Sequence, residues 1–193
     1  FLIKYLLNEN NGLRSTEIPA EGAARKRLLR SLMNIRPPKI VSREFLEVQD
    51  AYLQEEREQK GVISLSDIQM ERPGIYLWQG DITRLSVDAI VNAANSAMLG
   101  CFIPCHGCID NAIHSAAGVQ LRLECSRIME RQKAEEATGH AKITKAYNLP
   151  CRYVLHTVGP MIHGAVTRRD CDLLSDCYRS CLELAAAYRL KRI

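Results

Sequence analysis

The spacing of apolar residues changes near residue 75, and this change constrains the fold more than any other feature. Before it, apolar residues follow a helical i, i+1, i+4 pattern, as at Leu28, Leu29 and Leu32. After it, short apolar runs rich in β-branched residues, at 75–78, 87–94 and 152–158, alternate with helical stretches at about 110–131 and 169–189. This alternation predicts an α/β fold with a mostly parallel sheet covered by helices.

Residues 1–74 are expected to form a helical N-terminal extension to a domain that spans residues 75–193. Pro37 and Pro38 end the second helix of this extension. A third helix is expected to begin after Ser42, a good N-cap, and to end by Gly61. Each short helix has one apolar face, which needs another surface to pack against. We therefore interpret the three helices as a cap on the α/β domain rather than as an independent domain.

The composition is that of an ordinary globular protein, with 47% hydrophobic residues and a net charge of +4 from 26 basic and 22 acidic residues. The basic residues are scattered among acidic neighbours, which does not favour binding to a nucleic-acid backbone. No apolar run approaches the roughly 18 residues that cross a bilayer, and the first residues lack the pattern of a secretory signal. We therefore expect a cytoplasmic protein without membrane or nucleic-acid partners.

The densest chemical signal lies in residues 100–108, which contain three cysteines and a histidine. Cys101, His106 and Cys108 offer two thiolates and an imidazole, which are donors that zinc prefers. Three protein ligands leave a fourth position for water or substrate, as in catalytic zinc sites, whereas Cys105 as a fourth ligand would make the site structural. Buried cysteines without metal behave as small apolar residues. The clustering favours a zinc site, and the role of Cys105 stays open.

Polar residues follow the first two predicted strands. Asp81 comes after the 75–78 run, where its carboxylate could accept a hydrogen bond from an exocyclic amine such as that of adenine, or could cap a turn. Asn92 and Asn95 end the next run, and their amides suit either sugar hydroxyls or turn formation. Ligands bind outside the carboxyl ends of strands in such sheets, and for these residues ligand binding and turn formation both stay open.

Asp110 follows Cys108 at the start of a predicted helix. Free backbone N–H groups at such a helix start form an anion site that suits phosphate. Asp110 could act as a general base on a water or hydroxyl beside the metal, or could cap the helix. We interpret His114 and His156 as structural histidines.

These segments resemble the macrodomain family, whose members bind ADP-ribose, and in particular the zinc-containing macrodomains close to the MacroD-type ADP-ribosyl hydrolases. The resemblance covers about residues 72–193 and rests on residues 77–83, 87–95, 100–118 and 153–160. It implies a three-layer α/β/α fold with a mixed, mostly parallel sheet. It also implies that family members continue past Ile193 with a further strand and a second glycine-rich loop, so we expect the C-terminal part of the fold to be absent here.

The resemblance also implies roles for individual residues in substrate binding. Asp81 and Ile82 would contact the adenine, and Asn95 would contact the distal ribose with support from Asn92. Backbone groups around residues 111–113 would bind the diphosphate. The implied substrate-binding residues are Asp81, Ile82, Asn92, Asn95, Asn111, Ala112 and Ile113.

For catalysis, the resemblance implies that Zn²⁺ is held by the two cysteines and the histidine described above, and that Asp110 and Asn95 take the catalytic positions. The expected activity is zinc-dependent hydrolysis of mono-ADP-ribose from a modified protein, with a carboxylate-linked side chain as the expected substrate. The expected partners are that modified protein and ADP-ribose. One alternative is a reader that binds ADP-ribose without cleaving it. Another is an interaction module stabilised by zinc, which would need Cys105 as a fourth ligand.

Overall fold

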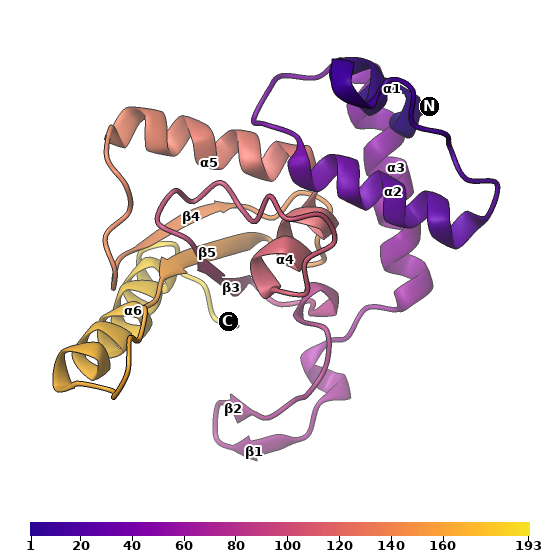
Figure 1. Ribbon diagram of the computed structural model, residues 1–193. Coiled ribbons are helices and arrows are strands. Elements are labelled where there is room, and N and C mark those ends of the chain that lie inside the picture. Colours follow the sequence, from indigo (N-terminus) through magenta and orange to yellow (C-terminus); the bar gives the residue numbers. More distant parts are fainter.

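The structure is a computed structural model that describes residues 1–193 (Figure 1). Its helices are α1 (Leu2–Glu9), α2 (Gly22–Ile35), α3 (Arg43–Lys60), α4 (Ile109–Ala117), α5 (Val119–Gln132) and α6 (Arg168–Ala187). Its strands are β1 (Met70–Arg72), β2 (Ile75–Tyr76), β3 (Ala89–Ala94), β4 (Ala141–Lys145) and β5 (Tyr153–Val158). Short 3-10 turns lie at η1 (Asn11–Leu13), η2 (Leu65–Asp67) and η3 (Ile82–Arg84).

The first three helices form a group of their own beside α4 and α5, drawn in indigo to purple in Figure 1. The predicted limits of α3 are confirmed, because the Ser42 hydroxyl accepts a hydrogen bond from the Phe45 N–H at 3.1 Å and Gly61, with φ of 76°, ends the helix. The apolar faces pack mainly on one another. They form a cluster of Leu2, Leu6, Leu7, Leu29, Leu32, Met33, Phe45 and Leu53.

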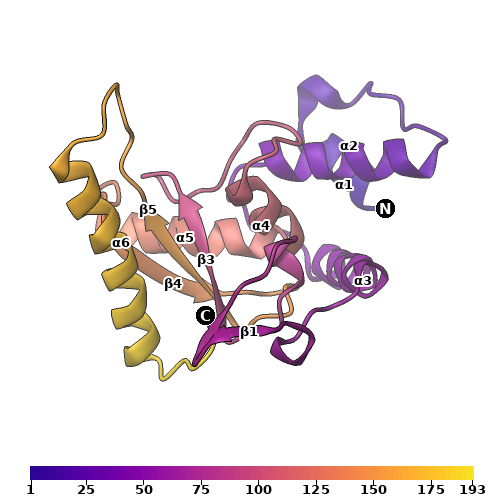
Figure 2. The ribbon, with the colours of Figure 1, turned by 90° about the horizontal axis from the view of Figure 1, so that it is seen from below.

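The main sheet has three strands in the order β3-β5-β4. β3 runs parallel to β5, with Ala89 opposite Tyr153, and β4 runs antiparallel to β5. Helices α4 and α5 cover one face of this sheet and α6 covers the other, as the two views show (Figures 1 and 2). The predicted α/β fold with three layers and a mixed sheet is therefore confirmed. Strand β4 was not predicted, because its short sequence has no clear alternation and only Thr144 is buried.

The predicted strand at 75–78 is wrong in its length and in its place. Only Ile75 and Tyr76 are extended, and they pair antiparallel with β1 outside the main sheet. The intervening Pro73 and Gly74, the latter with φ of 76°, form the turn of this small hairpin. Both strands are exposed, so the apolar residues of this run do not form a buried strand.

The single helix predicted for 110–131 is also wrong, since Gly118 divides it into α4 and α5. Gly118 has φ of 98°, which only glycine adopts easily. A Cβ atom at this position would lie 2.6 Å from Oε1 of Gln120 and 2.7 Å from Nε2 of Gln49. The break therefore brings the start of α5 against α3.

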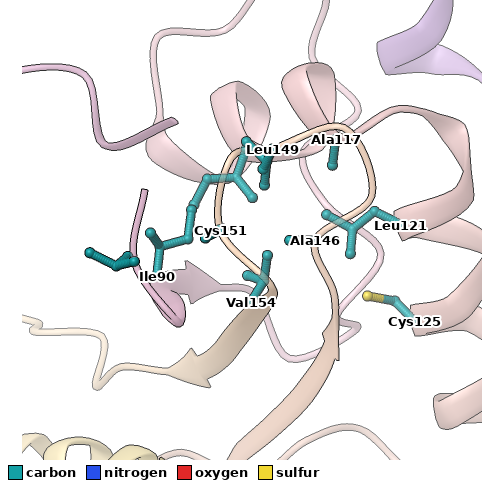
Figure 3. Packing of buried hydrophobic residues seen from close by; sticks show 10 residues of the cluster. Ile90, Ala117, Leu121, Cys125, Ala146, Leu149, Cys151 and Val154 are labelled. Atoms are coloured by element: carbon teal, nitrogen blue, oxygen red, sulfur yellow. The ribbon is translucent and has the colours of Figure 1, made fainter. Parts of the chain in front are cut away.

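Apolar residues are buried on both faces of the main sheet. The larger cluster lies between the sheet and α4 and α5, where Figure 3 shows Ala117 and Leu121 turned toward Val154. A smaller cluster of Ala89, Leu155 and Cys181 lies under α6. None of the helices combines the length and the apolarity needed to cross a bilayer.

Candidate functional site

The predicted polar residues meet at the carboxyl end of β3 and in the loop that leads to α4. Asn92 lies within β3, Asn95 follows the strand, and Asp110 lies in the first turn of α4. Since β3 and β5 are parallel, their carboxyl ends share one edge of the sheet, which is where ligands bind in folds of this kind.

Two amides hold the Asp110 carboxylate. The Asn92 Nδ2 donates to Oδ1 at 2.8 Å, and the Asn95 Nδ2 lies 3.4 Å from Oδ2 as a longer donor. Asp110 is buried, and this burial raises the pKa of its carboxyl above the usual range, although the hydrogen bond from Asn92 and the charge of Arg122 oppose the rise. The carboxyl is thus oriented by the protein and placed in a setting that suits proton transfer.

A chain of buried hydrogen bonds supports Asn92 from below. The Asn92 Nδ2 lies 3.1 Å from Nδ1 of His156 in β5, and the Thr144 hydroxyl in β4 lies 2.9 Å from Nε2 of the same ring. Burial lowers the pKa of His156 to about 4, so the ring is neutral. A neutral ring that accepts at Nδ1 and donates from Nε2 satisfies both contacts. Both ring nitrogens thus have partners within the protein, which favours the interpretation of His156 as a structural histidine.

His114 lies one turn after Asp110 on α4. Its Nε2 is 3.5 Å from Oδ1 of Asp110, and burial lowers the pKa of the ring well below its usual range. Gly100 packs directly on this ring, because a Cβ atom there would lie 2.8 Å from Cγ of His114. With φ of 77°, Gly100 is also the residue that lets the loop approach α4 this closely.

The sulfur atoms of Cys101 and Cys108 and a ring nitrogen of His106 all lie within 4.8 Å of one another. Cys101 Sγ is 3.6 Å from His106 Nδ1. Zinc binds sulfur at about 2.3 Å and nitrogen at about 2.0 Å in tetrahedral geometry, so small shifts bring these atoms onto one ion. The donor types and their spacing therefore fit zinc.

Cys105 is turned away from these three residues. Its sulfur lies 3.2 Å from the Ser31 hydroxyl and 3.5 Å from the carbonyl oxygen of Arg27, both in α2. Its φ of 52° turns the chain at this point. This arrangement favours the alternative with three protein ligands and a fourth position left for water or substrate.

Helix α2 holds the other side of this loop, which sequence reasoning did not anticipate. The buried Asn34 side chain accepts a hydrogen bond from the Cys105 N–H at 2.9 Å and donates to the Ser115 hydroxyl at 2.9 Å. Arg30 donates to the Asn111 side chain at 2.8 Å and to the His106 carbonyl at 3.2 Å. The loop that carries the metal donors is thus fixed by the N-terminal helices as well as by α4.

Arg122 of α5 joins these parts from inside the protein. Its buried guanidinium donates to the carbonyls of Asn34 at 2.7 Å, Leu99 at 2.7 Å and Cys101 at 3.3 Å, and it lies over the Phe102 ring. Burial lowers the pKa of Arg122 to about 10, so it stays cationic at neutral pH. The sequence offered one signal for this role, which is that Arg122 is a charged residue directly after Leu121 on the buried face of a helix.

The remaining predicted substrate-binding residues contact neighbouring groups of the protein. One carboxylate oxygen of Asp81 accepts hydrogen bonds from the N–H and the hydroxyl of Thr83, at 3.0 and 2.6 Å, as the turn-capping alternative describes. Ile82 packs against the larger apolar cluster. The Asn111 N–H donates to Sγ of Cys108, and the Ala112 N–H donates to the carbonyl oxygen of Cys108. The contacts of residues 81–82 with adenine and of residues 111–113 with a diphosphate stay predictions.

Comparison with known proteins gives consistent matches. The model of the Macro domain family matches residues 91–193. The Protein-ADP-ribose hydrolase of Treponema medium is 57% identical over 100% of this chain and 76% of its own length. The Protein-ADP-ribose hydrolase of Staphylococcus aureus strain MSSA476 is 45% identical over 99% of this chain and 74% of its own length. Among solved structures, the Trypanosoma brucei macrodomain in complex with ADP-ribose is 31% identical, with a TM-score of 0.56, over 80% of this chain and 67% of that one.

Proposed function

The chain belongs to the Macro domain family, and from this premise we propose that it is a zinc-dependent protein-ADP-ribose hydrolase that removes mono-ADP-ribose from carboxylate side chains. Two of its relatives are named protein-ADP-ribose hydrolase, and a third macrodomain has been solved with ADP-ribose. The observation that carries the proposal is the Asp110 carboxyl, which two amides orient beside the three zinc donors.

In this proposal, Asp81 and Ile82 hold the adenine and Asn95 orients the distal ribose toward Asp110. Asp110 accepts a proton from an attacking water, whose oxygen bonds to the anomeric carbon of the ribose. The bond between that carbon and the carboxylate oxygen of the modified protein breaks. The products are free ADP-ribose and the restored side chain of the modified protein, which leaves as a carboxylate.

Asn92 acts by orienting Asp110 rather than by contacting the substrate, because it is fully buried beneath the carboxyl. Cys101, His106 and Cys108 would hold the zinc ion at this edge of the sheet. When bound, the ion supplies a Lewis acid beside the ribose. The positive end of the helix dipole at the start of α4 adds a positive potential that suits the diphosphate.

The test is single-turnover release of ADP-ribose from a protein that is mono-ADP-ribosylated on a carboxylate. Release is measured with the protein as purified, after chelation, and after zinc is restored. We expect release to fall on chelation and to return with zinc. Asp110→Asn keeps the shape of the side chain and is expected to slow release by about 100-fold or more, while Asp172→Asn on the exposed surface of α6 should leave the rate unchanged.

Two outcomes would contradict parts of this proposal. Release at the parent rate by the Asp110→Asn protein would remove Asp110 from the mechanism. Tight binding of ADP-ribose by the zinc-loaded protein, with no release at all, would instead favour the reader alternative and would leave Asp110 with a structural role, as the acceptor for Asn92 and Asn95.

A further inference from the structure

The segment between β3 and Asp110, residues 95–109, carries exposed apolar side chains beside the three zinc donors. It runs from the end of β3 toward α2 and returns to the start of α4 (Figure 2). Residues 96–109 include no Asp, Glu, Lys or Arg, although these residue types make up 25% of the chain. Three large apolar residues of this stretch are exposed, and each lies within two positions of a zinc donor in the sequence. These residues, named here the apolar rim, are Phe102, Ile103 and Ile109.

Ile103 is the most exposed residue of the apolar rim, at 58%. Its carbonyl oxygen accepts hydrogen bonds from the Asn111 Nδ2 at 3.0 Å and from the His106 N–H at 3.2 Å. Asn111 directly follows Asp110 in α4. The backbone of Ile103 is therefore fixed beside the turn of α4 that carries Asp110, while more than half of the residue stays open to solvent.

The other two residues of the apolar rim are also held in place. The guanidinium of Arg122 lies 4.1 Å from the centre of the Phe102 ring, which is 40% exposed. Ile109 is the first residue of α4, directly before Asp110, and is 37% exposed. An apolar surface that is already ordered loses little conformational entropy when a partner covers it.

The apolar rim adjoins the place where the modified protein has to lie. In the proposed reaction, the bond that breaks joins the distal ribose to a side chain of that protein, and Asp110 and the zinc donors surround this bond. Phe102 and Ile109 directly follow two of the zinc donors in the chain, and Ile103 contacts the residue after Asp110. The apolar rim is therefore close to the protein part of the substrate rather than to the adenine.

Solvation decides which protein segment fits this surface. An apolar side chain gains free energy when the apolar rim removes it from water. A charged side chain would lose hydration over a stretch that offers no opposite charge. Single exposed apolar residues are common on protein surfaces, whereas a group of them beside a reactive centre is typical of an interaction surface.

We propose that the apolar rim binds the modified protein and selects a linked side chain that has a large apolar residue directly next to it in the sequence. The proposal rests on the hydrolase function proposed above and adds a substrate preference to it. Contacts away from the reacting bond are the same in the bound substrate and in the transition state, so the apolar rim changes KM rather than kcat.

The test compares two peptides that are mono-ADP-ribosylated at a single glutamate and differ only in the residues on either side of it, which are leucine in one peptide and serine in the other. We expect the zinc-loaded protein to cleave the leucine peptide with a kcat/KM about tenfold higher, through a lower KM. Ile103→Ser should reduce this preference to within about twofold and keep kcat. The matched control is Ile40→Ser between α2 and α3, where Ile40 is 75% exposed, and it should keep the preference of the parent.

Binding measurements keep the two proposals apart. Ile103→Ser should bind zinc and free ADP-ribose as tightly as the parent does, because its side chain is a ligand of neither. The Asp110→Asn protein, which releases slowly, should bind the leucine peptide about tenfold more tightly than the serine peptide. Equal kcat/KM and equal affinity for the two peptides would overturn the role of the apolar rim, and so would an equal loss of preference in Ile103→Ser and Ile40→Ser. Release from neither peptide, together with tighter binding of the leucine peptide, would overturn the hydrolase function and support the apolar rim.

Discussion

The N-terminal helices and the α/β body are each stabilised by apolar packing, but the contacts between them are largely polar. The two largest clusters of buried apolar residues each lie within one region, one in the body and one in the N-terminal helices. At the junction, the fully buried Gln49 of α3 accepts from the Val119 N–H and donates to Gln120, while Asn34 and Arg122 connect α2 to the body. Hydrogen bonds depend on geometry more strongly than apolar contacts do. The junction therefore sets the position of the helices, and through them the loop that carries the zinc donors.

The largest expected effect comes from removing the centre of this junction. Arg122→Met keeps an aliphatic side chain but leaves several buried carbonyl groups without a donor. We expect a loss of about 3 kcal/mol or more in the free energy of unfolding, measured with urea. Arg131→Met, on the exposed end of the same helix, is the control and should change the stability by less than about 0.5 kcal/mol. Similar losses in both variants would show that the junction does not depend on Arg122.

Acid should destabilise the α/β body through its histidines, because all five histidines of the chain lie in the body. The pKa of His156 is about 4 in the folded chain and about 6.5 in the unfolded chain, so the unfolded chain binds more protons between these values. Stability is therefore fully present above about pH 6.5 and falls as the pH decreases toward 4. We expect His156 to contribute a loss of about 2 kcal/mol between about pH 7 and pH 5.

Urea unfolding at these two pH values checks this prediction. His156→Gln should be less stable at neutral pH and should lose less on acidification, since glutamine does not titrate. His140→Gln is the control because His140 is exposed, and it should keep the pH dependence of the parent. A pH dependence that is unchanged in His156→Gln would contradict the assignment.

The elements inside each region could be predicted from the sequence, whereas the contacts at the junction could not. Helical periodicity and the Ser42 cap predicted the N-terminal helices, and the β-branched runs predicted β3 and β5, because burial of one face leaves a repeating pattern. Local spacing also grouped Cys101, His106 and Cys108. The partners of Arg122 and Asn34 across the junction could not be predicted, because they lie 71 to 89 residues away in the sequence and depend on how the two regions meet.

A smaller effect should show how much α2 contributes to holding the loop that carries the zinc donors. Asn34→Leu removes the acceptor for the Cys105 N–H while it keeps the volume, and we expect about 1–2 kcal/mol of destabilisation. Because Asn34 positions the loop without touching the zinc donors, we also expect about tenfold weaker zinc binding, measured by competition with a chelator. Asn34→Asp keeps an acceptor and should restore much of the zinc affinity. Equal zinc affinity in all three proteins would remove α2 from the support of the metal site.

The last expected effect, on stability alone, concerns the glycine at which α3 meets α5. Gly118→Ala introduces a Cβ atom against Gln49 and Gln120 and places alanine at a φ of 98°, so we expect a loss of about 1–2 kcal/mol in the free energy of unfolding. The matched control is Gly22→Ala at the start of α2, where a Cβ atom would meet nothing within 4 Å. Alanine favours helix, so this control should be neutral or slightly stabilising. Equal effects of the two substitutions would mean that the junction tolerates displacement of Gln49, and the polar contacts of α3 would then matter less than those of α2.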